Sequence, residues 1–206
     1  MRIPSFIGIG SWIVAAAYFL YEPLAIAASQ ATYSAIQQPM SDLGVTECGL
    51  NTYPWADYDI CSPHAAIVNG LFLLTAISIS VGAFYLYQES QKSQTIKVAV
   101  GLLLVFSIGN GFSVIPANVH FNWHTVPAMV AMVAVIPAIG LFGLNTIKGK
   151  WLSYICCFLT LLILVGFILI AFFSLEIGGL LQRVFYGLIY SWGIGMSIVI
   201  TNRKTG

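Results

Sequence analysis

Residues Gln38 to His64 read QPMSDLGVTECGLNTYPWADYDICSPH, and this is the one long polar stretch in a chain that is otherwise apolar. It holds four of the seven acidic residues and two of the four cysteines, and it contains no lysine or arginine. Loops longer than about 12–15 residues are usually either functional or disordered. This one is not of low complexity, so we expect it to be ordered and to have a function.

The composition around this loop is that of a membrane protein. The 206 residues are 59% hydrophobic and only 7% charged, and the mean hydropathy is +0.90. A soluble domain carries roughly 25% charged residues. This chain has too few charged side chains to cover a surface that faces water, so membrane lipids must be its main partners. It has no basic cluster that could follow a phosphate backbone, so we expect no nucleic-acid partner. The sequence identifies no protein partner.

Six apolar segments have the length of about 18–25 residues that a helix needs to cross a bilayer. Their predicted bounds are Phe6–Ala28, His64–Tyr87, Val98–Pro116, Pro127–Ile147, Trp151–Leu175 and Val184–Thr201. The sequence therefore predicts an all-α fold, an integral membrane bundle of six transmembrane helices, as a single domain over residues 1–206. The long outer loop 29–63 follows the first helix, and we expect it to form a lid.

The basic residues predict how the bundle is oriented. Seven of the eight, all except Arg183, fall on the side that holds both termini. Because loops rich in Lys and Arg stay in the cytoplasm, we expect cytoplasmic N- and C-termini in a prokaryotic inner membrane. The long loop would then face the periplasm or exterior. Ala25-Ile26-Ala27 resembles a signal-peptide cleavage site, but the apolar run before it is long for a signal peptide, which favours a retained helix.

Cys48 and Cys61 both lie in the predicted outer loop. An oxidising compartment such as a periplasm allows two such cysteines to pair, and no third cysteine on that side competes with them. We therefore expect a disulfide that staples the loop. A redox role is disfavoured because the loop has no Cys-x-x-Cys pair.

Four polar residues near the outer side are candidates for ligand binding, and they are Glu22, Asn118, Arg183 and Tyr186. A carboxylate near the outer end of the first helix is costly unless it faces a polar cavity or the lipid headgroups. Arg183 could bind a headgroup phosphate. A structural salt bridge with Glu22, Asp42 or Glu176 is the favoured alternative.

All three histidines, His64, His120 and His124, fall on the predicted outer side. If the last two are on a helix, their i, i+4 spacing places them on one face, as in helical zinc sites. Three histidines with a carboxylate could hold zinc. Zinc is therefore a possible cofactor, and the sequence identifies no other. The alternative is three interfacial histidines with satisfied hydrogen bonds. Haem ranks low because its axial histidines usually lie deeper in a bundle.

Ser41 and Asp42 join His124 as candidate catalytic residues. A zinc-bound water with Asp42 as general base could hydrolyse an ester or amide of a lipid. The same groups could instead form a headgroup or ion pocket without chemistry. A Gly-x-Ser-x-Gly elbow and a His-Glu-x-x-His motif are both absent from the sequence, so neither hydrolase class has support.

The predicted third helix carries Ser107, Asn110 and Ser113 near one face. Small and polar residues on one face usually indicate close packing of helices with hydrogen bonds between them. We favour that interpretation over a pore lining because no ionisable group accompanies these residues.

Three stretches of the chain resemble a known family. Pro39-Met40-Ser41-Asp42-Leu43-Gly44 resembles the Pro-x-Ser-(Asp or Glu)-Leu-Gly signature of the domain of unknown function 998 family, which consists of six-helix prokaryotic membrane proteins. Ile115-Pro116 followed by His124, and Gly179-Leu180-Leu181-Gln182-Arg183 followed by Trp192, are similar to two further parts of that family. The resemblance spans nearly the whole chain.

The resemblance implies six helices and an outward-facing cluster of motif residues, but no established activity. The motif residues that it carries over are Ser41, Asp42, Gly44, His124 and Arg183. Cys48 and Cys61 are not part of the family motifs, so the disulfide would be a local addition. A looser similarity in residue types links the chain to membrane metal hydrolases of the ceramidase and progestin-receptor-like group, whose helix count and motif order differ.

These observations leave three functions open. The favoured one is a membrane protein that binds a lipid headgroup or small ligand in an outward-facing polar pocket, without chemistry. The alternative is a metal-dependent lipid hydrolase or transferase at the same pocket, so the sequence does not decide whether the protein is an enzyme. A transporter is disfavoured because the six helices show no inverted repeat and the charges do not reach the midplane.

Overall fold

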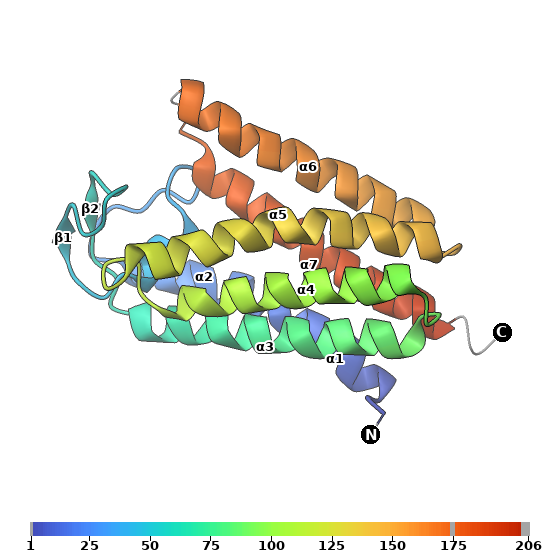
Figure 1. Cartoon of the computed structure of the whole chain (residues 1–206). Coiled ribbons are helices and arrows are strands. Elements are labelled where there is room, and N and C mark those ends of the chain that lie inside the picture. Colours follow the sequence, from blue (N-terminus) through green and yellow to red (C-terminus); the bar gives the residue numbers. More distant parts are fainter. Residues whose placement is uncertain (1, 174–175, 203–206) are drawn as a thin grey trace.

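The computed structural model describes residues 2–173 and 176–202 (Figure 1). Its helices are α1 (Ser5–Ala15), α2 (Ala17–Ala28), α3 (Ala65–Glu89), α4 (Gln94–Gly111), α5 (Phe121–Asn145), α6 (Lys150–Phe173) and α7 (Gly178–Asn202). Two short 3-10 helices, η1 (Met40–Gly44) and η2 (Phe112–Val114), and the antiparallel strands β1 (Gly49–Leu50) and β2 (Asp59–Ile60) complete the described elements. Among them, six helical spans are long and apolar enough to cross a membrane, which confirms the predicted all-α membrane bundle.

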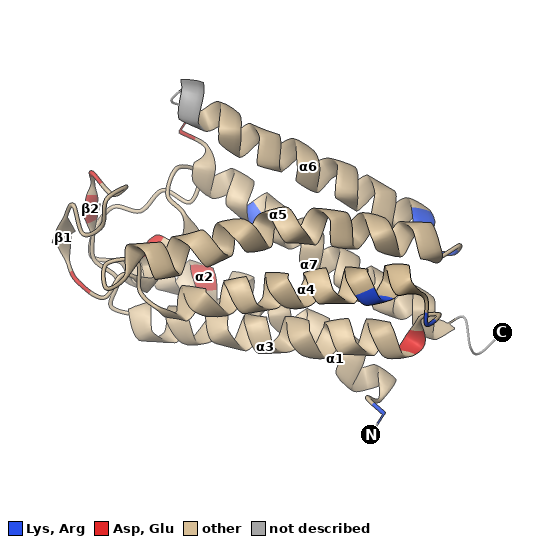
Figure 2. Ribbon diagram, in the orientation of Figure 1, with Lys and Arg blue, Asp and Glu red and all other residues tan. Residues whose placement is uncertain are grey.

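The loop that follows α2 covers one end of the bundle, where β1 and β2 also lie (Figure 1). Figure 2 shows most of the described basic residues at the opposite end, whereas most acidic residues lie at the loop end. Of the seven basic residues predicted for the inner side, Arg203 and Lys204 lie outside the described residues. The two ends therefore differ in charge as predicted, and the orientation across the membrane stays a prediction.

The first span is broken into α1 and α2 at Ala16, whose φ of −86° and ψ of 1° leave the helical region. The amide of Phe19 bonds to the carbonyl of Ala16, so the carbonyl of Ala15 loses its usual helical donor. The hydroxyl of Thr75 in α3 donates to that carbonyl at 3.1 Å. Because an unsatisfied backbone group costs several kcal/mol in lipid, this hydrogen bond stabilises the break.

One cluster of buried aromatic rings lies in the half of the bundle away from the loop. Trp12 of α1 and Trp192 of α7 are buried edge to face, with ring centroids 6.0 Å apart, and Phe142 of α5 packs on Trp192. Gly82 and Gly193 pack directly against the Trp12 ring, where a Cβ atom would overlap it. Trp192, part of the third family-like stretch, therefore belongs to the core.

Two helices begin six residues earlier than predicted, the largest differences at a helix start. α5 begins at Phe121 instead of Pro127, and α7 begins at Gly178 instead of Val184. Pro127 lies inside α5, where a missing amide donor is tolerated in membrane helices. At the start of α7 the amides of Gly179 and Leu180 donate to loop carbonyls at 3.1 and 2.9 Å, which satisfies donors that a helix start leaves open. His124 and Arg183 are therefore helical residues.

The helix predicted for Trp151–Leu175 corresponds to α6, which ends at Phe173. Residues 174 and 175 lie outside the described residues. α6 is at the edge of the bundle, beside α5 and α7 (Figure 1). Many of its apolar side chains are exposed, among them Ile155, Phe158 and Leu162, so this helix offers an apolar face to lipid.

Candidate functional site

The loop 29–63 is folded and packs against the end of the bundle. Cys48 and Cys61 form the predicted disulfide, next to the paired strands β1 and β2. The loop has a small apolar core of its own, in which buried Tyr53 stacks on Phe121 at the start of α5 and Trp55 meets the same ring edge to face. The predicted lid is therefore ordered and fastened to α5.

An ion pair fastens the loop to the helices. The Arg183 guanidinium lies 2.7 Å from a carboxylate oxygen of Glu22, and both side chains are buried. Tyr18 donates to the same oxygen at 2.8 Å, and Arg183 donates to the hydroxyl of Tyr33 in the loop at 2.5 Å. The favoured prediction, a structural salt bridge of Arg183, is confirmed with Glu22 as its partner.

Arg183 also holds the loop through its backbone. One terminal nitrogen, Nη1, donates to the carbonyls of Ala35 and Gln38 at 2.7 and 3.0 Å and to that of Gly179 at 2.9 Å. Nε is buried and has no hydrogen-bond partner among the described residues. Because both terminal nitrogens bind the protein itself, the structure does not present Arg183 and Glu22 as free binding residues.

Asp42 lies inside the loop, in η1, and is 1% exposed. Its two carboxylate oxygens accept hydrogen bonds from the hydroxyls of Tyr53 at 2.5 Å and Tyr58 at 2.7 Å. Burial raises the pKa of Asp42 to about 6, against the opposing effect of these two donors and of Arg183. Burial also raises the pKa values of both tyrosines, so each keeps the proton that it donates. Asp42 thus secures the lid, and its oxygens are not free to act as the predicted general base.

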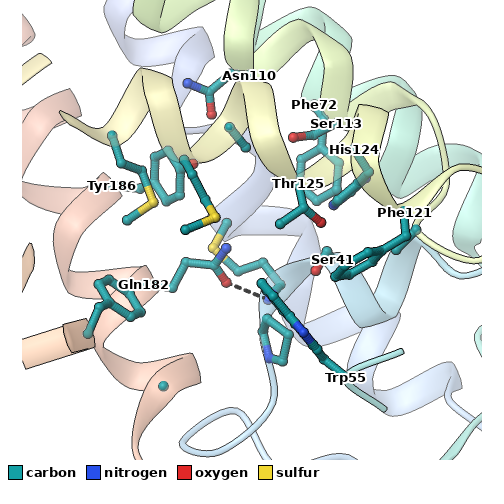
Figure 3. Close-up of a pocket in the computed structure, with 18 of the residues that line it drawn as sticks. Ser41, Trp55, Phe72, Asn110, Ser113, Phe121, His124, Thr125, Gln182 and Tyr186 are labelled. Atoms are coloured by element: carbon teal, nitrogen blue, oxygen red, sulfur yellow. Dashed lines mark hydrogen bonds between the residues drawn. The ribbon is translucent and has the colours of Figure 1, made fainter. Parts of the chain in front are cut away.

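A cavity of about 820 Å³ lies between the loop and the bundle (Figure 3). It is partly open, and it occupies the half of the bundle that is covered by the loop. Apolar side chains of α5 and α6 form a continuous part of its wall, and α7 adds the rings of Tyr186 and Tyr190. The polar side chains that line it are Gln37, Ser41, Thr75, Asn110, Ser113, His124, Thr125 and Gln182, together with several tyrosine hydroxyls. No Lys, Arg, Asp or Glu among the described residues lines it.

His124 is the buried histidine of this cavity. It lies in the first turn of α5 and is 7% exposed. Its Nδ1 lies 2.6 Å from the carbonyl oxygen of Ile115, and a carbonyl can only accept, so Nδ1 must carry the proton. In the neutral ring Nε2 is then a hydrogen-bond acceptor. This hydrogen bond joins the two parts of the second family-like stretch, Ile115-Pro116 and His124.

Gln182 is a lining residue that we did not predict. Its side-chain oxygen accepts from the amide of Met40 at 2.8 Å, as the dashed line in Figure 3 shows. This contact orients the side-chain amide group, so that its nitrogen remains as a donor. Gln182 belongs to the third family-like stretch and Met40 to the first, so the two stretches meet at the cavity. Its place in that family-like stretch was the sequence signal that could have found it.

The three histidines do not form the predicted metal site. Where the chain is described, no group of three or more His, Cys, Asp or Glu residues could hold a metal ion. His64 contacts the hydroxyl of Tyr21 on α2 through Nδ1 at 3.0 Å. His120 is exposed and caps α5 with a non-helical φ of −147°. It therefore does not share a helical face with His124, and the i, i+4 argument fails.

Of the other predicted site residues, some line the cavity and one does not. Ser41 and Tyr186 line the cavity. Asn118 does not line it. Its side-chain oxygen accepts from the backbone amide of Thr46 at 3.1 Å, and its side-chain nitrogen donates to the Thr46 hydroxyl at 3.0 Å. These bonds connect the loop to the turn before α5. The predicted binding role of Asn118 is thus replaced by a contact within the protein.

The polar face of α4 divides between the two interpretations. Ser107 donates to the carbonyl of Ala76 in α3 at 2.5 Å, which is the helix packing that we favoured. Asn110 and Ser113 line the cavity instead. Ser113 lies in η2, directly after α4, so the predicted polar face contacts α3 at Ser107 and lines the cavity at its outer end.

A family model described as "Protein of unknown function (DUF998)" matches residues 13–199 of the chain. This range covers nearly all described elements, including the three stretches that meet at or near the cavity. The comparisons with curated proteins and with solved structures found no match.

Proposed function

Since the chain belongs to the DUF998 family of proteins of unknown function, we propose from its structure that this multi-pass membrane protein binds an amphipathic, lipid-like molecule beneath its lid. The observation that carries the proposal is the two-part wall of the cavity. Neutral polar groups such as Ser41, His124 and Gln182 lie under the loop, and apolar side chains of α5 and α6 continue from there along the membrane span. A molecule with one polar end and one hydrocarbon end matches this division.

The size and place of the cavity support the same proposal. Pockets that bind small molecules usually measure roughly 300–1,000 Å³, and this one, at about 820 Å³, is at the large end of that range. Lining residues of α5 run from Phe121 to Val133, which corresponds to about 18 Å along the helix axis. A hydrocarbon chain extended beside α5 would replace lipid contacts with protein contacts.

The alternative, a metal-dependent lipid hydrolase, has weaker support. Asp42, its proposed base, has both oxygens occupied by tyrosines. The three histidines are dispersed over the end of the bundle, with one on Tyr21, one exposed and one in the cavity. Binding without chemistry therefore remains the function that this geometry supports best.

A pair of neighbouring substitutions on α5 tests the proposal. Ala128 lines the cavity, whereas Val130 does not line it and is 54% exposed. We expect Ala128→Phe to fill part of the cavity and to remove co-purifying lipid from the protein in native mass spectrometry. Val130→Phe adds the same ring two residues away and should retain the lipid. Equal retention in both variants, with both folded, would contradict a ligand in this cavity.

A further inference from the structure

We infer that the ligand of this cavity is an uncharged lipid alcohol, whose polar head donates a hydroxyl proton to His124 and offers an acceptor to Gln182. The inference rests on the proposed function and adds the chemical class of the ligand. It differs from the expectation that Arg183 binds a headgroup phosphate.

The charge of the lining excludes ionised headgroups. No charged residue among the described residues lines the cavity. Removing an ionised phosphate or ammonium from water without a counter-charge costs several kcal/mol. Arg183 is held by Glu22 and by three backbone carbonyls, and Asp42 is held by two tyrosines. Both of these charged groups are therefore engaged within the protein, and neither lines the cavity.

His124 requires a ligand that donates a hydrogen bond. Its Nδ1 proton is used by the carbonyl of Ile115 at 2.6 Å, so the neutral ring has only an acceptor, Nε2, left for the cavity that it lines. The structure shows no hydrogen bond from another described residue to Nε2. Ethers, esters and ketones have no proton to give, whereas an alcohol has one.

Gln182 requires an acceptor on the same ligand. Its oxygen is used by the amide of Met40 at 2.8 Å, so its amide nitrogen is the group left for the cavity. The hydroxyls of Ser41 and Thr125 also line the cavity, and neither is hydrogen-bonded to another described residue. His124 and Gln182 lie on different sides of the cavity (Figure 3). A hydroxyl oxygen both donates and accepts, so an alcohol head group offers the donor that His124 needs and the acceptor that Gln182 needs.

The remaining wall is suited to a hydrocarbon tail. Met132 and Val133 of α5 face this space together with Leu164, Phe167 and Ile170 of α6. These side chains carry no hydrogen-bonding group apart from the weakly accepting methionine sulfur. The tail could be an acyl chain, as in a monoacylglycerol, or an isoprenoid chain, as in a polyprenol. Both sources share the hydroxyl head.

The test uses the purified, delipidated full-length protein and native mass spectrometry with four probes: 1-oleoylglycerol, farnesol, dioleoylphosphatidylglycerol and dioleoylphosphatidylcholine. We expect one or both alcohols to bind at least about tenfold more tightly than either phospholipid, because an unpaired ionised head would be desolvated. The ratio of 1-oleoylglycerol to farnesol then identifies the tail.

His124→Asn tests the contact itself, because an asparagine amide nitrogen can take the place of Nδ1 and donate to Ile115 while nothing replaces Nε2. We expect this variant to bind the preferred alcohol about tenfold more weakly, the effect of one lost hydrogen bond. Affinity for the methyl ether of that alcohol should be unchanged, since the ether cannot donate. His120→Asn, at an exposed histidine outside the cavity, should leave both affinities unchanged.

The outcomes separate the two proposals. Phospholipid binding as tight as that of the alcohols, and sensitive to Ala128→Phe, would overturn the lipid alcohol and leave the lipid-binding function intact. An equal loss of alcohol and ether affinity in a folded His124→Asn protein would overturn the role of Nε2. If no probe binds the wild-type protein, the proposed function itself is wrong.

Discussion

Glu22 was an ambiguous residue in the sequence, because a carboxylate at the end of a membrane helix can face headgroups, a cavity or a partner. The structure shows the partner: Arg183, from the far end of the chain, at 2.7 Å with both side chains buried. A buried pair is a weak source of net stability, but removing one member leaves an uncompensated charge. The pair therefore determines where the loop can lie.

Glu22→Gln should destabilise the protein strongly. The substitution removes the negative charge and leaves the Arg183 guanidinium buried among neutral groups, which costs about 3–5 kcal/mol in the free energy of unfolding. Thermal or denaturant unfolding of the purified protein measures the effect.

Asp57→Asn is the matched control for this prediction. Asp57 is an exposed acidic residue of the loop. Surface substitutions of this kind usually change stability by no more than about 0.5 kcal/mol, so the control should unfold almost as the wild-type protein does. Equal losses in the two variants would show that burial is not the reason for the effect.

Asp42 should make stability depend on pH. Its pKa is about 6 in the folded protein, against an ordinary value of 3.8, so the folded state binds the proton more tightly than the unfolded state. This contribution to the free energy of unfolding is therefore complete below pH 3.8 and is lost as the pH rises through 6. The loss amounts to about 3 kcal/mol at most.

Asp42→Asn isolates that contribution, because asparagine does not titrate. We expect unfolding midpoints between about pH 4 and 7 to fall with rising pH more steeply for the wild-type protein than for the variant. Parallel pH profiles would show that Asp42 has the same pKa in the folded and unfolded states.

At the scale of an element, the start of α7 depends on the loop that crosses it. Gly178 and Gly179 open the helix where hydropathy alone predicted a turn, because loop carbonyls accept from its first amides. A Cβ atom at Gly179 would overlap the backbone carbonyl oxygens of Gln38 and Ala35. Those carbonyls are also held by Arg183, so they cannot move aside freely.

Gly179→Ala should therefore destabilise the protein by about 1–3 kcal/mol through overpacking. Gly187→Ala, two turns further along the same helix, provides the comparison, since nothing lies within 4 Å of a Cβ atom there. That variant should be neutral or gain up to about 1 kcal/mol from helix propensity. Unfolding measurements that rank the two variants in the opposite order would contradict the close approach of loop and helix.

At the scale of the whole molecule, the opposed charges of the two ends predict which end faces the cytoplasm. We expect Val119→Cys, in the exposed turn before α5, to react with a membrane-impermeant maleimide added to intact cells. Lys92→Cys, in the turn between α3 and α4, should react only after the membrane is opened. The reverse pattern would place the lid and its cavity in the cytoplasm.

The sequence by itself determined the six spans, the ordered loop and the pairing of Cys48 with Cys61. Each depends on local properties: hydropathy over some twenty residues, the length of one polar stretch, and two cysteines with no rival nearby. The histidine site failed because it assumed a shared helical face, whereas His120 caps α5 and only His124 reaches the cavity. A pattern of spacing cannot show where a helix begins.

Only the tertiary structure decided the cavity and its chemistry. Its lining comes from the loop and from helices on both sides of it in the chain, so no local window contains the site. The roles of Arg183, Gln182 and His124 were likewise settled by their partners: a carboxylate, a backbone amide and a backbone carbonyl. Which group remains free to meet a ligand depends on which groups the fold has already used, and that is a property of long-range contacts alone.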